Sequence, residues 1–159
     1  MIRPVSDFSK SVAELSRFLG IESTSDIKFT GITSDSRAVE AGDLFVALTG
    51  TKSHGASFID EVVKLGAVAV LTDSKGAELI GNKLPTLIIT NPRRELGDLC
   101  SWFYGSPSNN LNIAGITGTN GKTTTVRLIS HLITETGLRV GMTGTDGVYI
   151  NHRLIDTGD

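Results

Sequence analysis

Apolar residues in the first hundred positions follow two patterns that alternate along the chain. In one pattern they recur three or four positions apart, which is typical of an amphipathic helix. In the other they form short, nearly continuous runs, which are typical of strands covered on both faces. The predicted helices lie at residues 12–19, at 58–65, near Glu78 and from Asn91 onward, and the predicted strands lie at 29–33, 44–48, 67–71 and 86–90. This β-α-β rhythm predicts a compact α/β domain.

Residues that favour helix ends support these boundaries. Gly20 follows the first helix, where a glycine adopts the left-handed closing conformation most easily. Asn91 and Pro92 are suited to the cap and the first position of the last helix in this domain. The single cysteine, Cys100, lies on the apolar face of that helix, so we expect it to pack in the core rather than to react.

A polar segment from Gly105 to Asn110 separates this domain from the last third of the chain. Its sequence GSPSNN favours turns over regular structure, which predicts a domain boundary. We therefore expect one domain over residues 1–106 and the beginning of a second over residues 107–159. The second segment is predicted to contain a buried strand at 111–117, a helix through Val126, Ile129 and Ile133 that stops at Gly137, and strands near Val140 and at 148–150.

Between that strand and that helix lies a glycine-rich loop, Thr117 to Thr125, with the sequence TGTNGKTTT. A strand, a glycine loop and a helix in this order are the context of a phosphate-binding loop. Its glycines let backbone N–H groups approach a polyphosphate, and the positive end of the helix favours anions. Lys122 is expected to act on the terminal phosphates, and the Thr123 hydroxyl to help hold Mg²⁺. The residues expected to bind the nucleotide are Gly118, Thr119, Asn120, Gly121, Lys122, Thr123 and Thr124.

The loop departs from the general phosphate-loop pattern at one position. That pattern has a glycine five residues before Gly121, where this chain has Ile116. We expect Gly118 to serve as the turning residue instead. A glycine turn that only caps a helix is the simpler interpretation, but it does not account for Lys122 followed by three threonines.

The second segment is small for its motif. A phosphate-loop helix packs on a mostly parallel sheet of several strands, and the patterns within 107–159 predict too few strands for such a sheet. We therefore expect the sequence to be the N-terminal part of a longer protein whose continuation supplies the rest of the sheet. By themselves, residues 107–159 are expected to be incompletely packed.

Composition and charge narrow the range of partners. The chain of 159 residues has a net charge of −2 and scattered Lys and Arg residues, which predicts no surface for nucleic acid or an anionic membrane. The first twenty residues include Asp7, Lys10 and Glu14 and no unbroken apolar stretch, which argues against a secretory signal. We expect a cytoplasmic protein that binds small molecules. His131 and His152 lack the spacing of zinc ligands, and no pattern indicates an oligomeric state.

Several stretches together resemble the Mur ligases, the ATP-dependent enzymes that build the peptide stem of bacterial cell-wall precursors. They are the loop TGTNGKTTT, GITSDSR at 31–37, AGDLFVAL at 41–48 and GTKSHG at 50–55. Their order and spacing cover most of the chain. The resemblance implies an α/β substrate-nucleotide domain, followed by the start of a phosphate-loop ATP-binding domain with a mostly parallel sheet. It also implies that the nucleotide of the glycine loop is ATP with Mg²⁺.

The nearest match within the family is the branch that adds the third residue of the stem, meso-diaminopimelate or L-lysine. The alternative is the branch that adds D-alanyl-D-alanine, which shares the stretches at 35–37 and 42–48 but usually has serine at the position of Thr119. The resemblance implies that the domain that selects the amino acid lies beyond Asp159.

The resemblance also assigns substrate contacts in the first domain. It implies that Ser34 and Ser36 contact the UDP part of the substrate UDP-N-acetylmuramoyl-L-Ala-D-Glu. Thr51, Lys52 and Ser53 are implied to form a second loop over that substrate. Relatives usually have aspartate where this chain has His54, which leaves the geometry of the second loop open. Asp35 and Arg37 are interpreted either as an ion pair that stabilises a turn or as part of the substrate site.

The implied reaction begins when ATP phosphorylates the free carboxylate of the UDP-linked substrate. The amine of the incoming amino acid then attacks the acyl phosphate. Further functional residues are implied to lie beyond residue 159, so residues 1–159 alone are expected to be inactive. Two other classes remain open: a phosphate-loop NTPase that couples hydrolysis to movement, and a non-catalytic module that binds a nucleotide sugar.

Overall fold

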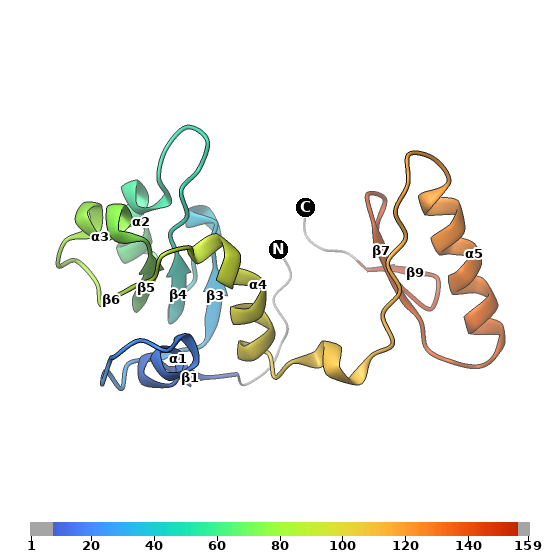
Figure 1. Ribbon diagram of the computed structural model, residues 1–159, viewed down its shortest axis with the longest axis horizontal. Helices are drawn as coiled ribbons and strands as arrows, with labels where there is room; N and C mark the ends of the chain where they lie inside the picture. Colours follow the sequence, from blue (N-terminus) through green and yellow to red (C-terminus); the bar gives the residue numbers. More distant parts are fainter. Residues whose placement is uncertain (1–7, 156–159) are drawn as a thin grey trace. The chain divides into compact units, whose positions relative to one another are not determined.

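The structure is a computed structural model that describes residues 8–155 (Figure 1). The described residues divide after Asn110 into two compact units. Residues 1–7 and 156–159 of the two expected domains, including Asp7, lie outside the described residues.

A four-stranded parallel sheet forms the centre of the first unit. Its strands are β3 (Gly31–Thr33), β4 (Asp43–Val46), β5 (Ala69–Thr72) and β6 (Thr86–Ile88). They lie side by side in sequence order, and all three pairings are parallel. The predicted α/β class and the four main strand positions are therefore confirmed.

The strand predicted at 29–33 is divided in two. Its first part, β2 (Lys28–Phe29), pairs in antiparallel fashion with β1 (Lys10–Ser11), a two-residue strand that the pattern did not predict. Its second part is β3, which pairs with β4. Between the two parts, the N–H of Thr30 donates to the carbonyl of Gly42 at 2.9 Å. One apolar run thus serves two sheets, and the pairing partners decide where it breaks.

Four helices connect and cover these strands. They are α1 (Val12–Leu19), α2 (Ile59–Lys64), α3 (Ser74–Ile80) and α4 (Pro92–Phe103), with short 3-10 turns η1 (Ser36–Ala38), η2 (Gly55–Phe58) and η3 (Pro107–Asn110).

The caps of these helices agree with the sequence signals. Gly20 ends α1 with a left-handed φ of 68°. The side chain of Asn91 accepts from the N–H of Arg94 at the start of α4, and Pro92 is at the first position of that helix. Cys100 of α4 is half-buried, and burial raises the pKa of its thiol, which agrees with a packing role.

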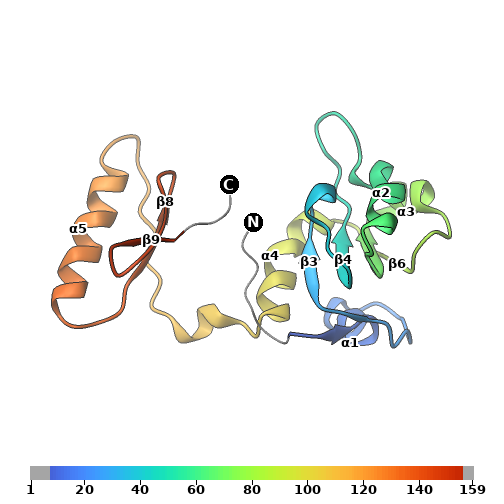
Figure 2. The ribbon, with the colours of Figure 1, turned by 180° about the vertical axis from the view of Figure 1, so that it is seen from behind.

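The helices cover both faces of the parallel sheet, which gives three layers (Figures 1 and 2). Successive residues of a strand point to opposite faces, so neighbouring positions enter different clusters. Leu44 and Val46 of β4 join the cluster formed with α1 and α4, whereas Phe45 joins the cluster formed with α2 and α3. Leu71 and Val70 of β5 divide in the same way. Burial on both faces explains why these strands are continuous apolar runs in the sequence.

The second unit consists of a helix and a small antiparallel sheet. The helix is α5 (Lys122–Glu135), and β7 (Gly141–Gly144), β8 (Gly147–Ile150) and β9 (Arg153–Ile155) come after it as a meander. The helix, its end before Gly137, and the strands near Val140 and at 148–150 were predicted. Strand β9 was not predicted.

One expectation for this unit is wrong: residues 111–117 do not form a strand. The sheet in the described part of 111–155 is antiparallel, and the mostly parallel sheet was expected to need strands from the continuation of the chain. An apolar run becomes a strand only when another strand satisfies its backbone hydrogen bonds. No parallel neighbour for 111–117 exists among the described residues, so apolar character alone did not suffice there.

Few side chains of the second unit are buried. Ser130 is the one buried residue among the described positions 111–155. On α5, Leu128 and Leu132 are each 58% exposed, and Ile129 and Ile133 are each 37% exposed. The incomplete packing expected for the face with Ile129 and Ile133 is present in the structure.

We expect this contrast to appear in amide hydrogen exchange of the 159-residue chain. Amides of β4, β5 and α4 should be strongly protected, because they belong to a buried core. Amides after Asn110 should exchange quickly, since α5 and its sheet have little buried apolar surface. Equal protection in both units of a dilute monomer would contradict the expectation.

Candidate functional site

The glycine-rich loop leads directly into α5. Gly121 caps the helix in a left-handed conformation with φ 77°, and no side chain caps the first turn. Gly118 also has a positive φ, of 150°. Both conformations favour glycine, which gives a local reason for these two residues. The loop therefore presents the N-terminus of a 14-residue helix, with N–H groups that no side chain occupies.

Lys122 folds back over this loop. Its Nζ donates to the carbonyl of Gly118 and, at 3.3 Å, to that of Thr119. Thr119, Asn120, Lys122, Thr123 and Thr124 are all exposed. The ammonium group and the first turn of α5 thus lie together at an accessible surface, an arrangement suited to an anion.

Ser34 and Ser36 lie in the turn after β3. Ser34 is exposed, and Ser36 is half-buried as the first residue of η1. Asp35 caps η1 through the N–H of Arg37 and forms an ion pair with the Arg37 guanidinium at 2.7 Å. Hydrogen bonds from the side chain and then the backbone of Arg37 lower the pKa of Asp35 to about 2. The ion pair that the sequence left as one alternative is therefore present.

Thr51, Lys52 and Ser53 lie in the exposed loop after β4. The base of this loop is closed by an isolated bridge between Thr49 and His54. The N–H of Gly50 donates to the Ser53 carbonyl at 3.1 Å. We call residues 50–53 the substrate loop, after the role that the resemblance implies.

Parallel pairing places both sets of residues at one edge of the sheet. Thr33 is in register with Phe45, so the turn after β3 and the loop after β4 both leave from the carboxyl edge. Ligands of open α/β sheets bind at this edge.

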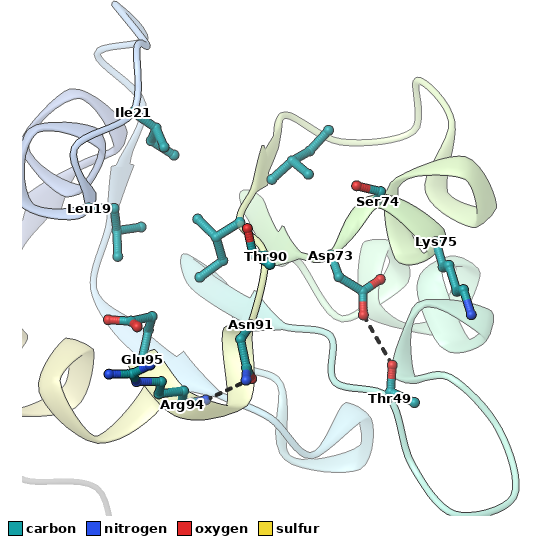
Figure 3. Close-up of a pocket in the computed structure, with 12 residues that line it drawn as sticks. Leu19, Ile21, Thr49, Asp73, Ser74, Lys75, Thr90, Asn91, Arg94 and Glu95 are labelled. Atoms are coloured by element: carbon teal, nitrogen blue, oxygen red, sulfur yellow. Dashed lines mark hydrogen bonds between the residues drawn. The ribbon is translucent and has the colours of Figure 1, made fainter.

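A hollow of about 930 Å³ opens at the same edge (Figure 3). Polar and charged side chains line part of it, among them Thr49, Asp73, Lys75, Asn91, Arg94 and Glu95. The sequence reasoning assigned none of them to a ligand site. The sequence did contain a signal for two of them, since residues that follow parallel strands lie at the carboxyl edge of the sheet. Asp73 comes directly after β5, and Asn91 comes closely after β6.

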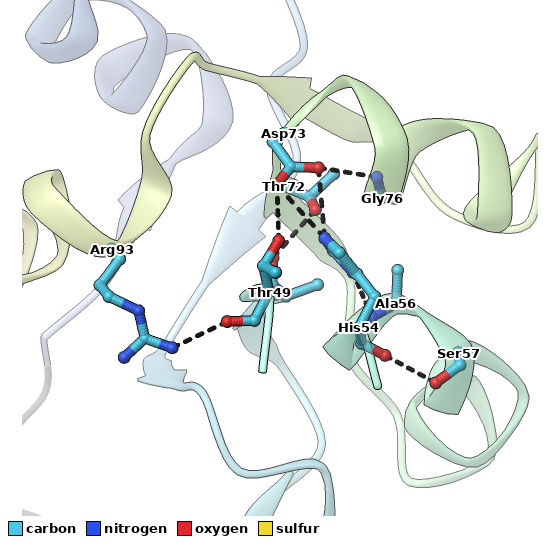
Figure 4. Close-up of polar contacts among 9 residues, drawn as sticks. Thr49, His54, Ala56, Ser57, Thr72, Asp73, Gly76 and Arg93 are labelled. Carbon is cyan, nitrogen blue, oxygen red and sulfur yellow. Dashed lines mark hydrogen bonds and ion pairs between the residues drawn. The ribbon is translucent and has the colours of Figure 1, made fainter. Parts of the chain in front are cut away.

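His54, at the end of the substrate loop, has hydrogen-bond partners in the structure. Its Nε2 lies 3.2 Å from Oδ1 of Asp73, and its Nδ1 accepts from the N–H of Ala56 at 3.0 Å (Figure 4). Arg93 donates from its guanidinium to the Thr49 carbonyl at 2.9 Å. The residues that flank the substrate loop are therefore both held by hydrogen bonds, Thr49 by Arg93 and His54 by Asp73.

The two histidines of the second unit lie near each other. The rings of His131 and His152 have centroids 6.0 Å apart. Within residues 8–155, no three His, Cys, Asp or Glu side chains gather in a group that could hold a metal ion. No helix in that range is long and apolar enough to cross a membrane.

Comparison with known protein families accounts for both units. Residues 28–104 match the Mur ligase family, catalytic domain, and residues 116–159 match the Mur ligase middle domain. The chain belongs to the Mur ligase family.

Comparison with individual relatives narrows the similarity to one branch of the family. The chain is 45% identical to UDP-N-acetylmuramoyl-L-alanyl-D-glutamate--2,6-diaminopimelate ligase of Streptomyces coelicolor, over 90% of this chain and 28% of that protein. A solved structure with the same ligase name has a TM-score of 0.68 at 28% identity, and the match covers 92% of this chain and 30% of the other. Both of these proteins belong to the branch called MurE.

A second branch is also similar in structure. A MurF ligase of Thermotoga maritima, solved in complex with ADP, has a TM-score of 0.50 at 29% identity, over 65% of this chain and 23% of that chain. The chain thus spans less than a third of the length of the proteins it matches.

Proposed function

We propose that this chain is part of an ATP-dependent ligase of the MurE type. The full enzyme would add the third stem residue, meso-diaminopimelate or L-lysine, to UDP-N-acetylmuramoyl-L-Ala-D-Glu through an acyl phosphate. The observation that carries the proposal is the N-terminus of α5, which no side chain caps, together with the Lys122 ammonium beside it. The 45% identity to a diaminopimelate ligase supports the choice of branch.

The residues of the glycine loop fit ATP. Backbone N–H groups from Gly118 to Thr124 would receive the phosphates, since the two positive-φ glycines let a ligand approach the backbone. Lys122 would leave the carbonyls that it contacts and neutralise charge that develops on the transferring phosphoryl group. The exposed hydroxyl of Thr123 is a suitable oxygen ligand for Mg²⁺, which would neutralise further phosphate charge when bound.

The first domain would hold the UDP part of the other substrate. Ser34 and Ser36 after β3 and Thr51, Lys52 and Ser53 after β4 present hydroxyls, backbone groups and one cation at the carboxyl edge of the sheet. Such groups bind a uridine and a diphosphate without a large basic surface. We also propose that the boundary between the two domains lies at residues 106–107. The enzyme would act in the cytoplasm, where nucleotide-linked substrates and ATP are present.

Replacing Ser36 with alanine tests the first domain. In a ligase of full family length that carries this sequence, the KM for UDP-N-acetylmuramoyl-L-Ala-D-Glu should rise and kcat should stay near the wild-type value. This pattern is expected when an interaction that binds substrate and transition state equally is lost. The KM for ATP should be unchanged. A rise in the ATP KM instead would contradict the division of roles between the domains.

Two measurements separate the alternatives. Binding of UDP by the 159-residue chain would distinguish a ligase from an NTPase that drives movement. ATP turnover that depends on the muramoyl substrate, in the full-length protein, would distinguish a ligase from a non-catalytic module that binds a nucleotide sugar. The MurF alternative predicts turnover with the UDP-linked tripeptide and D-alanyl-D-alanine in place of the UDP-linked dipeptide.

A further inference from the structure

A partly buried hydrogen-bonded network anchors the base of the substrate loop. His54 pairs with Thr49 in the bridge that closes the loop and approaches both carboxylate oxygens of Asp73, at 3.2 and 3.3 Å. Asp73 comes directly after β5, so this contact joins two neighbouring strands beyond their last ladder pair. Figure 4 shows the His54 ring directed toward Asp73, close to Gly76 in the first turn of α3.

The hydrogen bonds define the form of the His54 ring. Because Nδ1 accepts from the N–H of Ala56, the proton of the neutral ring is on Nε2, which donates to Asp73. Asp73 also accepts from the N–H of Gly76 at 2.8 Å and from the Thr49 hydroxyl at 3.1 Å. The pKa of Asp73 is lowered, first by the hydrogen bond from Gly76 and further by those from His54 and Thr49. The acceptor is thus a carboxylate, which strengthens the contact.

Gly76 of α3 makes room for this contact. A Cβ at residue 76 would lie 2.6 Å from Cε1 of His54 and 2.0 Å from the Thr72 hydroxyl oxygen. Glycine is a poor residue for the interior of a helix. Its presence here allows the His54 ring and the first turn of α3 to approach closely.

Burial separates the anchor from the loop that it holds. The side chains of His54 and Asp73 are 10% and 23% exposed, whereas Thr51, Lys52 and Ser53 are exposed. The anchor is therefore mostly out of contact with solvent, and the loop is available to a ligand.

We propose that His54 and Asp73 are positioning residues that hold the substrate loop in the conformation that receives the UDP-linked substrate. This inference rests on the proposed function, which assigns Thr51, Lys52 and Ser53 to that substrate. A loop that is already ordered loses less conformational entropy when its ligand binds. Breaking the anchor therefore weakens binding without removing any group that touches the substrate.

Two substitutions of His54 separate its two hydrogen bonds. In His54→Asn the side-chain carbonyl can still accept from Ala56 but is too short to reach Asp73. In His54→Gln the longer amide can still donate to Asp73. Titration calorimetry with UDP-N-acetylmuramoyl-L-Ala-D-Glu and the 159-residue chain should give roughly tenfold weaker binding for His54→Asn, because a hydrogen bond to a charged group is lost. His54→Gln should recover most of that loss.

Coupling and exchange measurements test the role of the pair. Asp73→Asn should add little to the loss already caused by His54→Asn, because both changes act on one contact: the first removes the charge of the acceptor and the second removes the donor. Amides at Thr51–Ser53 should exchange faster in His54→Asn, with β4 and β5 still protected. The matched control is Lys83→Gln, which breaks an exposed ion pair with Asp60 and should bind as the wild type does.

Three results would overturn the inference. One is wild-type affinity in His54→Asn while the wild-type chain binds the substrate, which leaves the proposed function intact. Another is loss of protection in β4 and β5 of His54→Asn, which would mean a general structural role. The third is a wild-type chain that binds neither UDP nor the UDP-linked dipeptide, which would remove the proposed function together with the inference.

Discussion

Replacing Lys122 with alanine is expected to lower the ligation rate by roughly 10²–10³, or about 3–4 kcal/mol of barrier, in a ligase of full family length that carries this sequence. The ammonium group lies over the glycine loop at the N-terminus of α5, within hydrogen-bond distance of loop carbonyls. There it can meet charge that develops on the phosphoryl group during transfer. The loss should appear in kcat under saturating ATP, measured as tripeptide product per unit time.

The fold should be unaffected by this change, because Lys122 is exposed and begins a helix that no side chain caps. Lys64→Ala is the matched control: Lys64 is an exposed lysine near the end of α2, far in the chain from the loop. It should keep wild-type turnover. Near-normal product formation by Lys122→Ala would refute the role assigned to this lysine.

Replacing Phe103 with alanine is expected to destabilise the first unit by about 3–5 kcal/mol, since a large buried aromatic leaves a cavity. Phe103 is fully buried, and its ring stacks on that of Phe29 with centroids 5.3 Å apart. It also meets Phe8 and Tyr104 edge-on or tilted. It therefore joins α4 to the β1–β2 region and to the larger core cluster.

Urea unfolding followed by tryptophan fluorescence measures this effect. Trp102 is the one tryptophan of the chain and lies in α4, so its emission reports on the first unit. The control is Phe58→Ala, because Phe58 is 40% exposed and its loss should change the midpoint much less. Equal midpoints for the two variants would show that burial does not determine the contribution of these side chains.

The strands predicted from the sequence agree with the structure better in the first unit than in the second. In the first, continuous apolar runs identified β4 and β5, because both strands are buried on both faces. Strand β6 was also identified, although only its Leu87 is buried. In the second, the largely apolar run at 111–117 formed no strand. The difference lies in the partners: a strand requires a neighbour for its backbone groups, and a pattern along one segment carries no information about that neighbour.

The candidate site divides in a similar way. The glycine loop could be recognised because all its parts are contiguous, and Gly118 and Gly121 have the positive φ that favours glycine. The contact between His54 and Asp73 could not, because nineteen positions separate the two residues. Only the parallel pairing of β4 with β5 brings the segments after these strands together.

The sequence by itself thus determined the local features: the capped helices, the buried strands, the glycine-rich loop and the family to which they belong. These arise from side-chain periodicity and from backbone conformations that act over a few residues. The tertiary structure alone decided the order of strands, the division of residues 29–33 between two sheets, and the anchor beneath the substrate loop. Each of these depends on hydrogen bonds between segments distant in the chain, which form only when the sheet sets their register.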